Sequence, residues 1–449
     1  MGQSNWPNRF VIARSVAEIF FPQRPQLGLD QRNCSAAVLD KIVSANAEHK
    51  STAKAKCMLW KLAEIKVSVP HIRDLTAMIG KELHDHQRQQ ADAHANQQLK
   101  PEYREPPKVV SVSVDGGRIM TRADAGRGVH EPAWKETKNA CLLTMSSFVS
   151  QEDPHPQLPA CFAERDYVEK LVREIHSCTM KSAAKCGEGG SFSEEVGADP
   201  ATLPSVEASP SRARKAENWR PRRLVRTCLS SMACSDDFGP LVAGEAQRRG
   251  FYQAERRAFL GDGQAWNWTL QDRCFPNFVG ITDFVHPLGY VYDAAQVLAP
   301  ADPWPVYLRA SEACWQGRVG DFLTELRAWQ TAHPVLGDEA LPDQDPRAII
   351  QTTITYLENN RARMNYPDYR RAGLPVSSAM IESLIKEINY RVKGTEKFWN
   401  RPDGAEHILQ VRAAALGDDD RLSQWILNRP GSPFYRRSTA DQDPLACAA

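Results

Sequence analysis

The segment Val109-Val110-Ser111-Val112-Ser113-Val114-Asp115-Gly116-Gly117 decides the fold class expected for this chain. Its β-branched and small residues alternate, and this pattern predicts a β-strand that ends at Asp115. Residues 118–122 and 140–145 have the composition of two further strands, so we expect an antiparallel meander. Asp-Gly is also a common turn dipeptide, so this pair alone does not distinguish a functional carboxylate from a turn.

Two later segments repeat the arrangement of a strand followed by an aspartate. Residues 257–260 lead to Gly261-Asp262-Gly263, and residues 278–282 lead to Asp283. Side chains that leave adjacent strands of one sheet can converge within the few ångströms that separate two bridged divalent cations. The sequence therefore predicts carboxylates at one sheet edge, with Asp262 and Asp283 both candidates for the second acid.

A third acid is expected on a helix that begins after Ser377, with Ser378 available as its N-cap. The polar face of this helix carries a carboxylate in the first turn and cations further along: Glu382, Lys386, Asn389 and Lys393. On one interpretation Glu382 and Lys386 form a stabilising surface pair. On the other, the carboxylate is a metal ligand and the cations hold a phosphate backbone.

The pattern divides the chain into an α/β catalytic core preceded by a small all-α domain. The third helix of that domain begins at Ser68, and the arrangement permits a helix-turn-helix, although a generic helical bundle fits equally. The all-α domain is expected at 1–86 and a linker at 87–107. The first part of the core follows at 108–286 and includes a flexible, partly basic insertion at about 150–225. A mainly helical stretch (287–372), the glutamate helix (373–416) and a tail without readable chemistry (417–449) complete the chain.

Composition excludes several classes of protein. Apolar residues make up 42% and charged residues 25% of the 449 positions, which are ordinary globular values, and no apolar run reaches the roughly 20 residues of a membrane helix. The eleven cysteines include no C-x-x-C pair, so we interpret them as reduced thiols. We expect a cytoplasmic protein without membrane contact. A net charge of +1 gives no global argument for nucleic acid, so charge is considered locally.

Cations interleaved with aromatic residues surround Glu382 in the sequence, a composition typical of a DNA-facing surface. The cations are Arg361, Arg363, Arg370, Arg371, Lys386, Arg391, Lys393 and Lys397, and the aromatic residues are Tyr366, Tyr369, Tyr390, Phe398 and Trp399. We assign DNA binding to six residues: Arg118, Lys386, Arg391, Lys393, Lys397 and Trp399. Trp399 and Trp266 could stack on an unpaired base or belong to the core.

Six blocks of the sequence resemble, in order, bacterial insertion-sequence DDE transposases related to the Mutator-like superfamily. They are VSVDGGR at 112–118, GRGVHEP at 126–132, LGDGQAW at 260–266, DFVH at 283–286, LPVSSAMIE at 374–382 and RVKGTEKFW at 391–399. The resemblance implies an RNase H-like catalytic domain with a helical insertion before the glutamate helix. It also implies Asp115, Asp262 and Glu382 as the catalytic, metal-binding acids, with Asp283 and His286 as a signature that organises the site.

The implied activity is cleavage and joining of DNA at insertion-sequence ends, with two Mg²⁺ or Mn²⁺ ions held by the three acids. The implied partners are double-stranded DNA at terminal repeats, target DNA and a second copy of the chain, as a homodimer or higher oligomer in the bacterial nucleoid. Two alternatives stay open. One is a degenerate or domesticated transposase that binds DNA without cutting it, and the other is a different RNase H-like nuclease.

Overall fold

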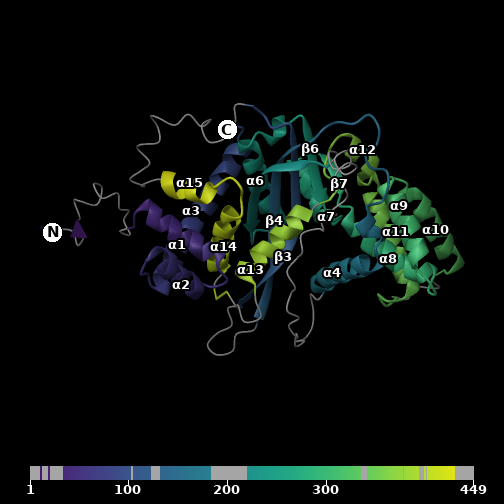
Figure 1. Cartoon of the computed structure of the whole chain (residues 1–449), viewed down its shortest axis with the longest axis horizontal. Coiled ribbons are helices and arrows are strands. Elements are labelled where there is room, and N and C mark those ends of the chain that lie inside the picture. The colour runs from purple at the N-terminus through teal and green to yellow at the C-terminus, as the bar shows by residue number, and fades with distance from the viewer. Residues whose placement is uncertain are drawn as a thin grey trace, which may run out of the picture.

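A mixed five-stranded sheet forms the centre of the described fold (Figure 1). The computed structural model of the chain describes residues 11–12, 19–20, 34–102, 105–122, 132–183, 220–334, 341–377, 379–393, 399–400 and 402–429. The five strands are β3 (Val109–Arg122), β4 (Pro132–Ser146), β5 (Arg222–Ser231), β6 (Arg256–Gly261) and β7 (Val279–Thr282). They lie in the order β5-β4-β3-β6-β7, so the predicted α/β class is confirmed.

β3 is a single 14-residue strand, so the predictions that a strand ends at Asp115 and that another begins at 118 are wrong. β4 pairs antiparallel with the whole length of β3. A β-carbon on Gly117 would come within 2.7 Å of the Thr137 hydroxyl on β4, so glycine at this position permits close strand pairing. Asp115 therefore projects from within a strand, on the same face of the sheet as buried Ile119.

The remaining strands extend the sheet on both sides of β3. β5 pairs antiparallel with β4 and completes a three-stranded meander, while β6 and β7 run parallel to β3. The strands predicted at 257–260 and 278–282 are confirmed within one residue at each end. β5 was not predicted, because its first residues, Arg222 and Arg223, are exposed and resemble the end of a basic loop.

Helices cover both faces of the sheet. On one face, α6 (Ser235–Arg248) and α7 (Ala265–Cys274) pack over a core that includes Val112, Phe238 and Phe259. On the other face lie α4 (Arg165–Ala183), α8 (Val285–Leu298) and α13 (Ala379–Val392). Asp115 is on this second face, so α13 and α8 are the helices that can bring other functional groups toward it.

The mainly helical stretch expected at 287–372 is confirmed. It lies on one side of the sheet, opposite the N-terminal helices (Figure 1). After α8, which begins just before it, the stretch contains α9 (Trp304–Trp315), α10 (Val319–Ala332), α11 (Pro346–Asn360) and α12 (Tyr366–Arg371). Earlier in the chain, α4 lies inside the segment predicted to be a flexible insertion, so the first part of that segment is ordered. Residues 184–219, with the basic run at 212–215, lie outside the described residues.

Three amphipathic helices precede the sheet as predicted: α1 (Ala36–Glu48), α2 (Thr52–Ala63) and α3 (Val69–Ala95). Ser68 caps α3, because its hydroxyl accepts a hydrogen bond from the His71 N–H at 3.3 Å. α3 continues to Ala95, so the first residues of the expected linker are helical. Gln87 and Ala91 of this extension are buried, and α3 packs against α6.

The N-terminal helices share a core with the end of the chain. Ile79 of α3 packs in one cluster with Val411 of α14 (Pro402–Ala415) and Ile426 of α15 (Arg421–Asn428). The predicted tail therefore contains a packed helix, and the predicted all-α domain is joined to the rest of the fold.

Smaller elements complete the described chain. β1 (Val11–Ile12) and β2 (Ile19–Phe20) pair antiparallel, and 3-10 turns occupy Ala160–Ala163, Phe251–Gln253 and Arg361–Arg363. Among the described helices, none combines the length and apolar character needed to cross a bilayer.

We predict that Gly80→Ala destabilises the protein by about 2 kcal/mol, because overpacking outweighs the gain in helix propensity. The new β-carbon would come within 2.7 Å of the carbonyl carbon of His407 on α14. Gly404→Ala, on α14 itself, is the matched control, since no atom lies within 4 Å of its added β-carbon. Urea unfolding of both variants tests this, and equal stability of the two would contradict the close α3–α14 contact.

Candidate functional site

Three aspartates reach the same level of three adjacent parallel strands. Ser113 of β3 is opposite Leu260 of β6, and Leu260 is opposite Ile281 of β7. Each acid lies two residues after one of these paired residues: Asp115 after Ser113, Asp262 after Leu260 and Asp283 after Ile281. Because neighbouring strands are about 4.8 Å apart, this register gathers the three aspartates along one short stretch of the sheet.

Glu382 reaches this group from the first turn of α13, as the sequence predicted. One possible ligand atom from each of Asp283, His286 and Glu382 lies within 4.8 Å of the others. In the described part of the chain, this is the one such group of acidic, histidine or cysteine side chains. The structure thus brings Glu382 together with the predicted Asp283–His286 signature, whereas Asp115 and Asp262 are not members of this group.

The electrostatics of Asp115 reflect this crowding of acids. Burial, and next the charge of Asp262, raise the pKa of Asp115 to about 7, and Glu382 contributes to the rise. The charge of His286 opposes it, as does the Gly116 N–H, which donates to Asp115 Oδ1 at 2.6 Å. Asp115 is therefore poised to lose its proton when a positive charge arrives.

His286 and Glu382 are perturbed in the same direction. Burial lowers the pKa of His286, but Asp283, Asp262, Asp115 and Glu382 raise it, so that it lies above its ordinary value. Burial, and then the charge of Asp283, raise the pKa of Glu382. The Nε2 atom of His286 is 3.8 Å from Asp283 Oδ2. His286 is the basic side chain in the group that it forms with Asp283 and Glu382.

The donor set fits a divalent cation such as Mg²⁺ or Mn²⁺. Carboxylate oxygens are the ligands that these ions prefer, and imidazole nitrogen is acceptable to Mn²⁺. Of the charges that act on Glu382, those of His286 and Lys386 lower its pKa, but they do not cancel the rise. A bound cation would oppose the burial and the charge of Asp262 that raise the pKa of Asp115.

Both candidates for the second acid belong to the site. The charge of Asp262 raises the pKa of Asp115, whereas the charge of Asp283 raises the pKa of Glu382. Asp283 is fully buried. Asp262 is half-buried, and its Oδ1 accepts hydrogen bonds from the Gln264 N–H at 3.0 Å and from Asn267 Nδ2. Asp262 as the catalytic acid, with Asp283 as an organising residue, stays a prediction.

Two of the cations expected to face DNA are structural. Arg391 is 5% exposed, and its guanidinium donates to the Asn46 carbonyl oxygen of α1 at 2.7 Å. Arg370 is fully buried, pairs with Asp153 and donates to the Trp315 carbonyl at 3.1 Å. Arg391 was assigned to DNA binding, and Arg370 was named among the cations of a DNA-facing composition, because a sequence does not distinguish a buried arginine from an exposed one. The burial of both side chains argues against a contact with DNA.

The other predicted DNA contacts have varied surroundings. Lys386 is exposed, with its ammonium 3.6 Å from Glu174 of α4. Lys393 lies 5.6 Å from the ring centroid of the exposed Trp134. Arg118 is on β3, an odd number of residues from Asp115, so it projects from the opposite face of the sheet. Lys397 and Ser378 lie outside the described residues.

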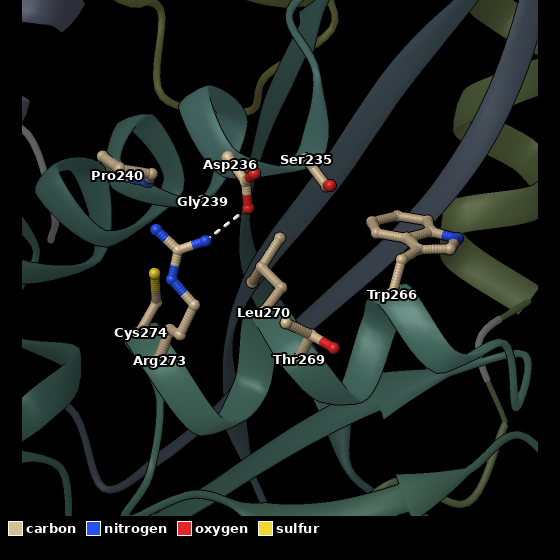
Figure 2. Close-up of a pocket in the computed structure, with 9 residues that line it drawn as sticks. All are labelled: Ser235, Asp236, Gly239, Pro240, Trp266, Thr269, Leu270, Arg273 and Cys274. Atoms are coloured by element: carbon tan, nitrogen blue, oxygen red, sulfur yellow. Dashed lines mark hydrogen bonds and ion pairs between the residues drawn. The ribbon is translucent and has the colours of Figure 1, made fainter.

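Trp399 and Trp266 occupy intermediate positions. Trp399 is half-buried, and its indole N–H donates to the Val392 carbonyl at 3.0 Å. Trp266 borders a depression between α6 and α7 (Figure 2), where Arg273 points toward and pairs with Asp236. The volume of this depression is about 10 Å³, room for about one water molecule, so it is no substrate pocket.

Two residues of α11, not identified from the sequence, hold the Asp262 loop. The Tyr356 hydroxyl donates to the Asp262 carbonyl oxygen at 2.8 Å, and burial raises the pKa of Tyr356, which keeps the donor proton in place. Asn360 is 1% exposed, and its amide donates to the Gly263 carbonyl at 3.4 Å. Gly263 has a φ of +96°, and a β-carbon there would meet the Tyr356 ring at 2.7 Å.

Asn360 also ties this loop to the neighbouring strand end. Its Oδ1 accepts hydrogen bonds from Trp268 Nε1 at 3.0 Å and from the Thr282 hydroxyl at 3.4 Å, directly before Asp283. Tyr356 and Asn360 are one helical turn apart and share a face, which the sequence indicates. Their partners, Asp262 and Gly263, lie 94 and 97 residues earlier in the chain, and no local pattern predicts these contacts.

A scan of the chain against protein-family models finds no match, and a search of curated proteins finds no significant one.

We predict that Tyr356→Phe weakens binding of Mn²⁺ alone about tenfold, because residues that orient ligands typically affect metal affinity by this amount. Titration calorimetry measures the affinity. Thermal unfolding should report a loss of about 1 kcal/mol for the missing hydrogen bond. Tyr292→Phe, on α8, is the matched control. Unchanged Mn²⁺ affinity in Tyr356→Phe would remove the positioning role from this contact.

The raised pKa of Asp115 predicts a pH-dependent stability of the protein in EDTA. The folded state keeps a proton that the unfolded state releases, so this stability is complete below about pH 4 and is lost as pH rises to about 7. Between pH 5 and pH 8 the wild type should lose about 2 to 3 kcal/mol more than Asp115→Asn does. Urea unfolding measures the difference, and parallel losses in the two proteins would contradict the assignment.

Proposed function

We propose that this protein is a DDE transposase, an RNase H-like enzyme that cleaves and joins DNA at the ends of an insertion sequence. The observation that carries the proposal is the common register of Asp115, Asp262 and Asp283, with Glu382 reaching the same place from α13. A three-stranded antiparallel meander extended by two parallel strands supports the RNase H-like assignment. The resemblance of the acid-bearing blocks supports the choice of reaction.

In the proposed mechanism, Asp115, Asp262 and Glu382 hold two Mg²⁺ or Mn²⁺ ions. When bound, such ions supply an activated water or 3′-hydroxyl and stabilise the leaving oxygen of a phosphodiester. Asp283 accepts a hydrogen bond from the Val285 N–H at 3.2 Å, and this fixes its carboxylate beside His286. The His286–Asp283 pair would orient Glu382, and Lys386 would face the scissile strand.

The second acid is held from outside the sheet. Tyr356 and Asn360 hold the two backbone carbonyls that directly follow the Asp262 side chain, so its carboxylate keeps its place when DNA approaches. Preorganisation of this kind is a major source of catalytic rate. The helical stretch between β7 and α13 thus has a supporting role in the reaction.

Two other functions compete with this one. A degenerate transposase would bind DNA without cutting it, but the presence and grouping of all the acids favour an enzyme. Another RNase H-like nuclease would cleave without joining. We propose double-stranded terminal repeats and target DNA as partners, with a homodimer or higher oligomer because two ends must be joined together.

The predicted test is Mn²⁺-dependent cleavage and joining of DNA that carries the ends flanking the gene. Asp115→Asn, Asp262→Asn and Glu382→Gln should lower the rate at least about 100-fold, because each removes a metal ligand. Asp283→Asn should lower it about tenfold, as expected for an orienting residue. Asp272→Asn changes an exposed acid on α7 and is the matched control.

Each departure from this ranking has a distinct meaning. A larger defect in Asp283→Asn than in Asp262→Asn moves the second acid to Asp283. A wild type that binds the ends in EDTA but never cleaves them favours the degenerate DNA-binding protein, and cleavage without joining favours a simple nuclease.

A further inference from the structure

α2 and the turn that follows it carry a concentration of positive charge. From residue 50 to residue 68 there are five lysines and one acid, Glu64. The lysines are all exposed, and within the described residues none of them forms an ion pair: Lys50, Lys54, Lys56, Lys61 and Lys66. Charges that form no internal ion pair are available for an external, negatively charged partner.

An open groove of about 410 Å³ lies within this basic surface. Its lining residues are Lys56, Trp60, Ile65, Lys66, Val67 and Ser68. Trp60 is 48% exposed, and the Lys66 ammonium lies 4.8 Å from its ring centroid. A large aromatic side chain left in solvent between two lysines matches a ligand that offers both negative charge and a flat or apolar surface.

The exposed side of α13 connects this groove with the carboxylates. Glu382, Lys386 and Tyr390 follow one another at four-residue spacing, so they lie on one helix face. At a rise of 1.5 Å per residue, the distance from Glu382 to Tyr390 along the helix is about 12 Å. Tyr390 is 50% exposed, and the Lys50 ammonium lies 5.8 Å from its ring centroid.

The relative position of α2 and α13 is fixed by buried hydrogen bonds. Arg391, next to Tyr390, donates to Asn46 of α1, and α1 packs directly against α2. The Arg412 guanidinium donates to the Glu387 carbonyl of α13 at 3.0 Å and to the Ala47 carbonyl of α1 at 3.3 Å. The two basic surfaces therefore act as one rigid surface.

We propose that a basic and aromatic track, made of Lys50, Lys56, Trp60, Lys66, Lys386 and Tyr390, binds the backbone of duplex DNA and leads it to the carboxylate group. The choice of DNA rests on the proposed function. The lysines contact phosphates, and Trp60 packs on deoxyribose. Neutralisation of a phosphate by lysine releases a counterion, which makes such binding strongly dependent on salt.

A membrane is a poorer match for this surface. A helix that lies in a bilayer needs a continuous apolar face, but the apolar face of α2, with Ala55 and Leu59, is buried in the protein. The exposed apolar side chains of α2 are Trp60 and Leu62, too small an area to anchor a protein of this size. Lysines spread over two helices suit an extended polyanion better.

Binding of a fluorescent DNA duplex in EDTA, where no cleavage occurs, tests the proposal. The double variant Lys56→Ala/Lys66→Ala should bind roughly tenfold to fiftyfold more weakly at 0.1 M salt. Its plot of log affinity against log salt should be shallower by about 2, one unit for each lost phosphate contact. Trp60→Ala should lower affinity about tenfold without changing the slope. Circular dichroism checks that each variant is folded.

Lys100→Ala/Lys108→Ala is the matched control, because both lysines are exposed and the charge change is the same. Wild-type affinity and slope in Lys56→Ala/Lys66→Ala would overturn the track. Binding to phosphatidylserine vesicles that depends on the same lysines, with DNA affinity unchanged, would overturn it in favour of a membrane. If the wild type shows lysine-dependent DNA binding but no metal-dependent cleavage, the proposed function is overturned and the DNA track is not.

Discussion

The crowding of four carboxyl groups in a partly buried place is the constraint on which the rest of this fold depends. The charges of Asp115, Asp262, Asp283 and Glu382 all act on His286. Burial raises the pKa of Asp115 and of Glu382, and the charge of Asp262 adds to the first shift and that of Asp283 to the second. Such a group is unfavourable unless the scaffold holds each member in place. Strand pairing holds Asp115 rigidly, because β3 is bonded along its whole length to β4 and partly to β6. Because β3 continues beyond Asp115, the backbone is paired with β4 on both sides of this residue.

Elements outside the sheet hold the remaining acids. α11 fixes the loop of Asp262 through Tyr356 and Asn360. α13, which carries Glu382, is tied at its far end to α1 by Arg391 and Arg412. Buried guanidinium groups serve here as hydrogen-bond donors to backbone carbonyls, a role that the planar, five-donor side chain of arginine fills well. Segments far apart in the sequence therefore hold the carboxylates of one site in place.

The sequence predicts the local parts of this arrangement but not their assembly. Alternating residues before Asp115, short apolar runs before Asp262 and Asp283, and the stripe around Glu382 are local patterns that indicate strands and a helix. Strand register is not local, so the common level of the three aspartates is visible only in the structure. The same holds for buried arginines: composition near Arg370 and Arg391 suggests a charged surface, whereas packing against Trp315 and α1 places both inside.

α13 joins the two kinds of chemistry on a single helix. Its first turn carries Glu382, and the cation Lys386 and the aromatic Tyr390 follow toward its C-terminal end. The helix dipole favours negative charge at the start and positive charge toward the end, so this order lowers the cost of holding an acid within a group of acids. The same order places positive charge on the part of α13 beyond the carboxylates, along the path proposed for DNA. One helix can therefore support both the acid group and the proposed DNA track, because its electrostatic asymmetry suits both.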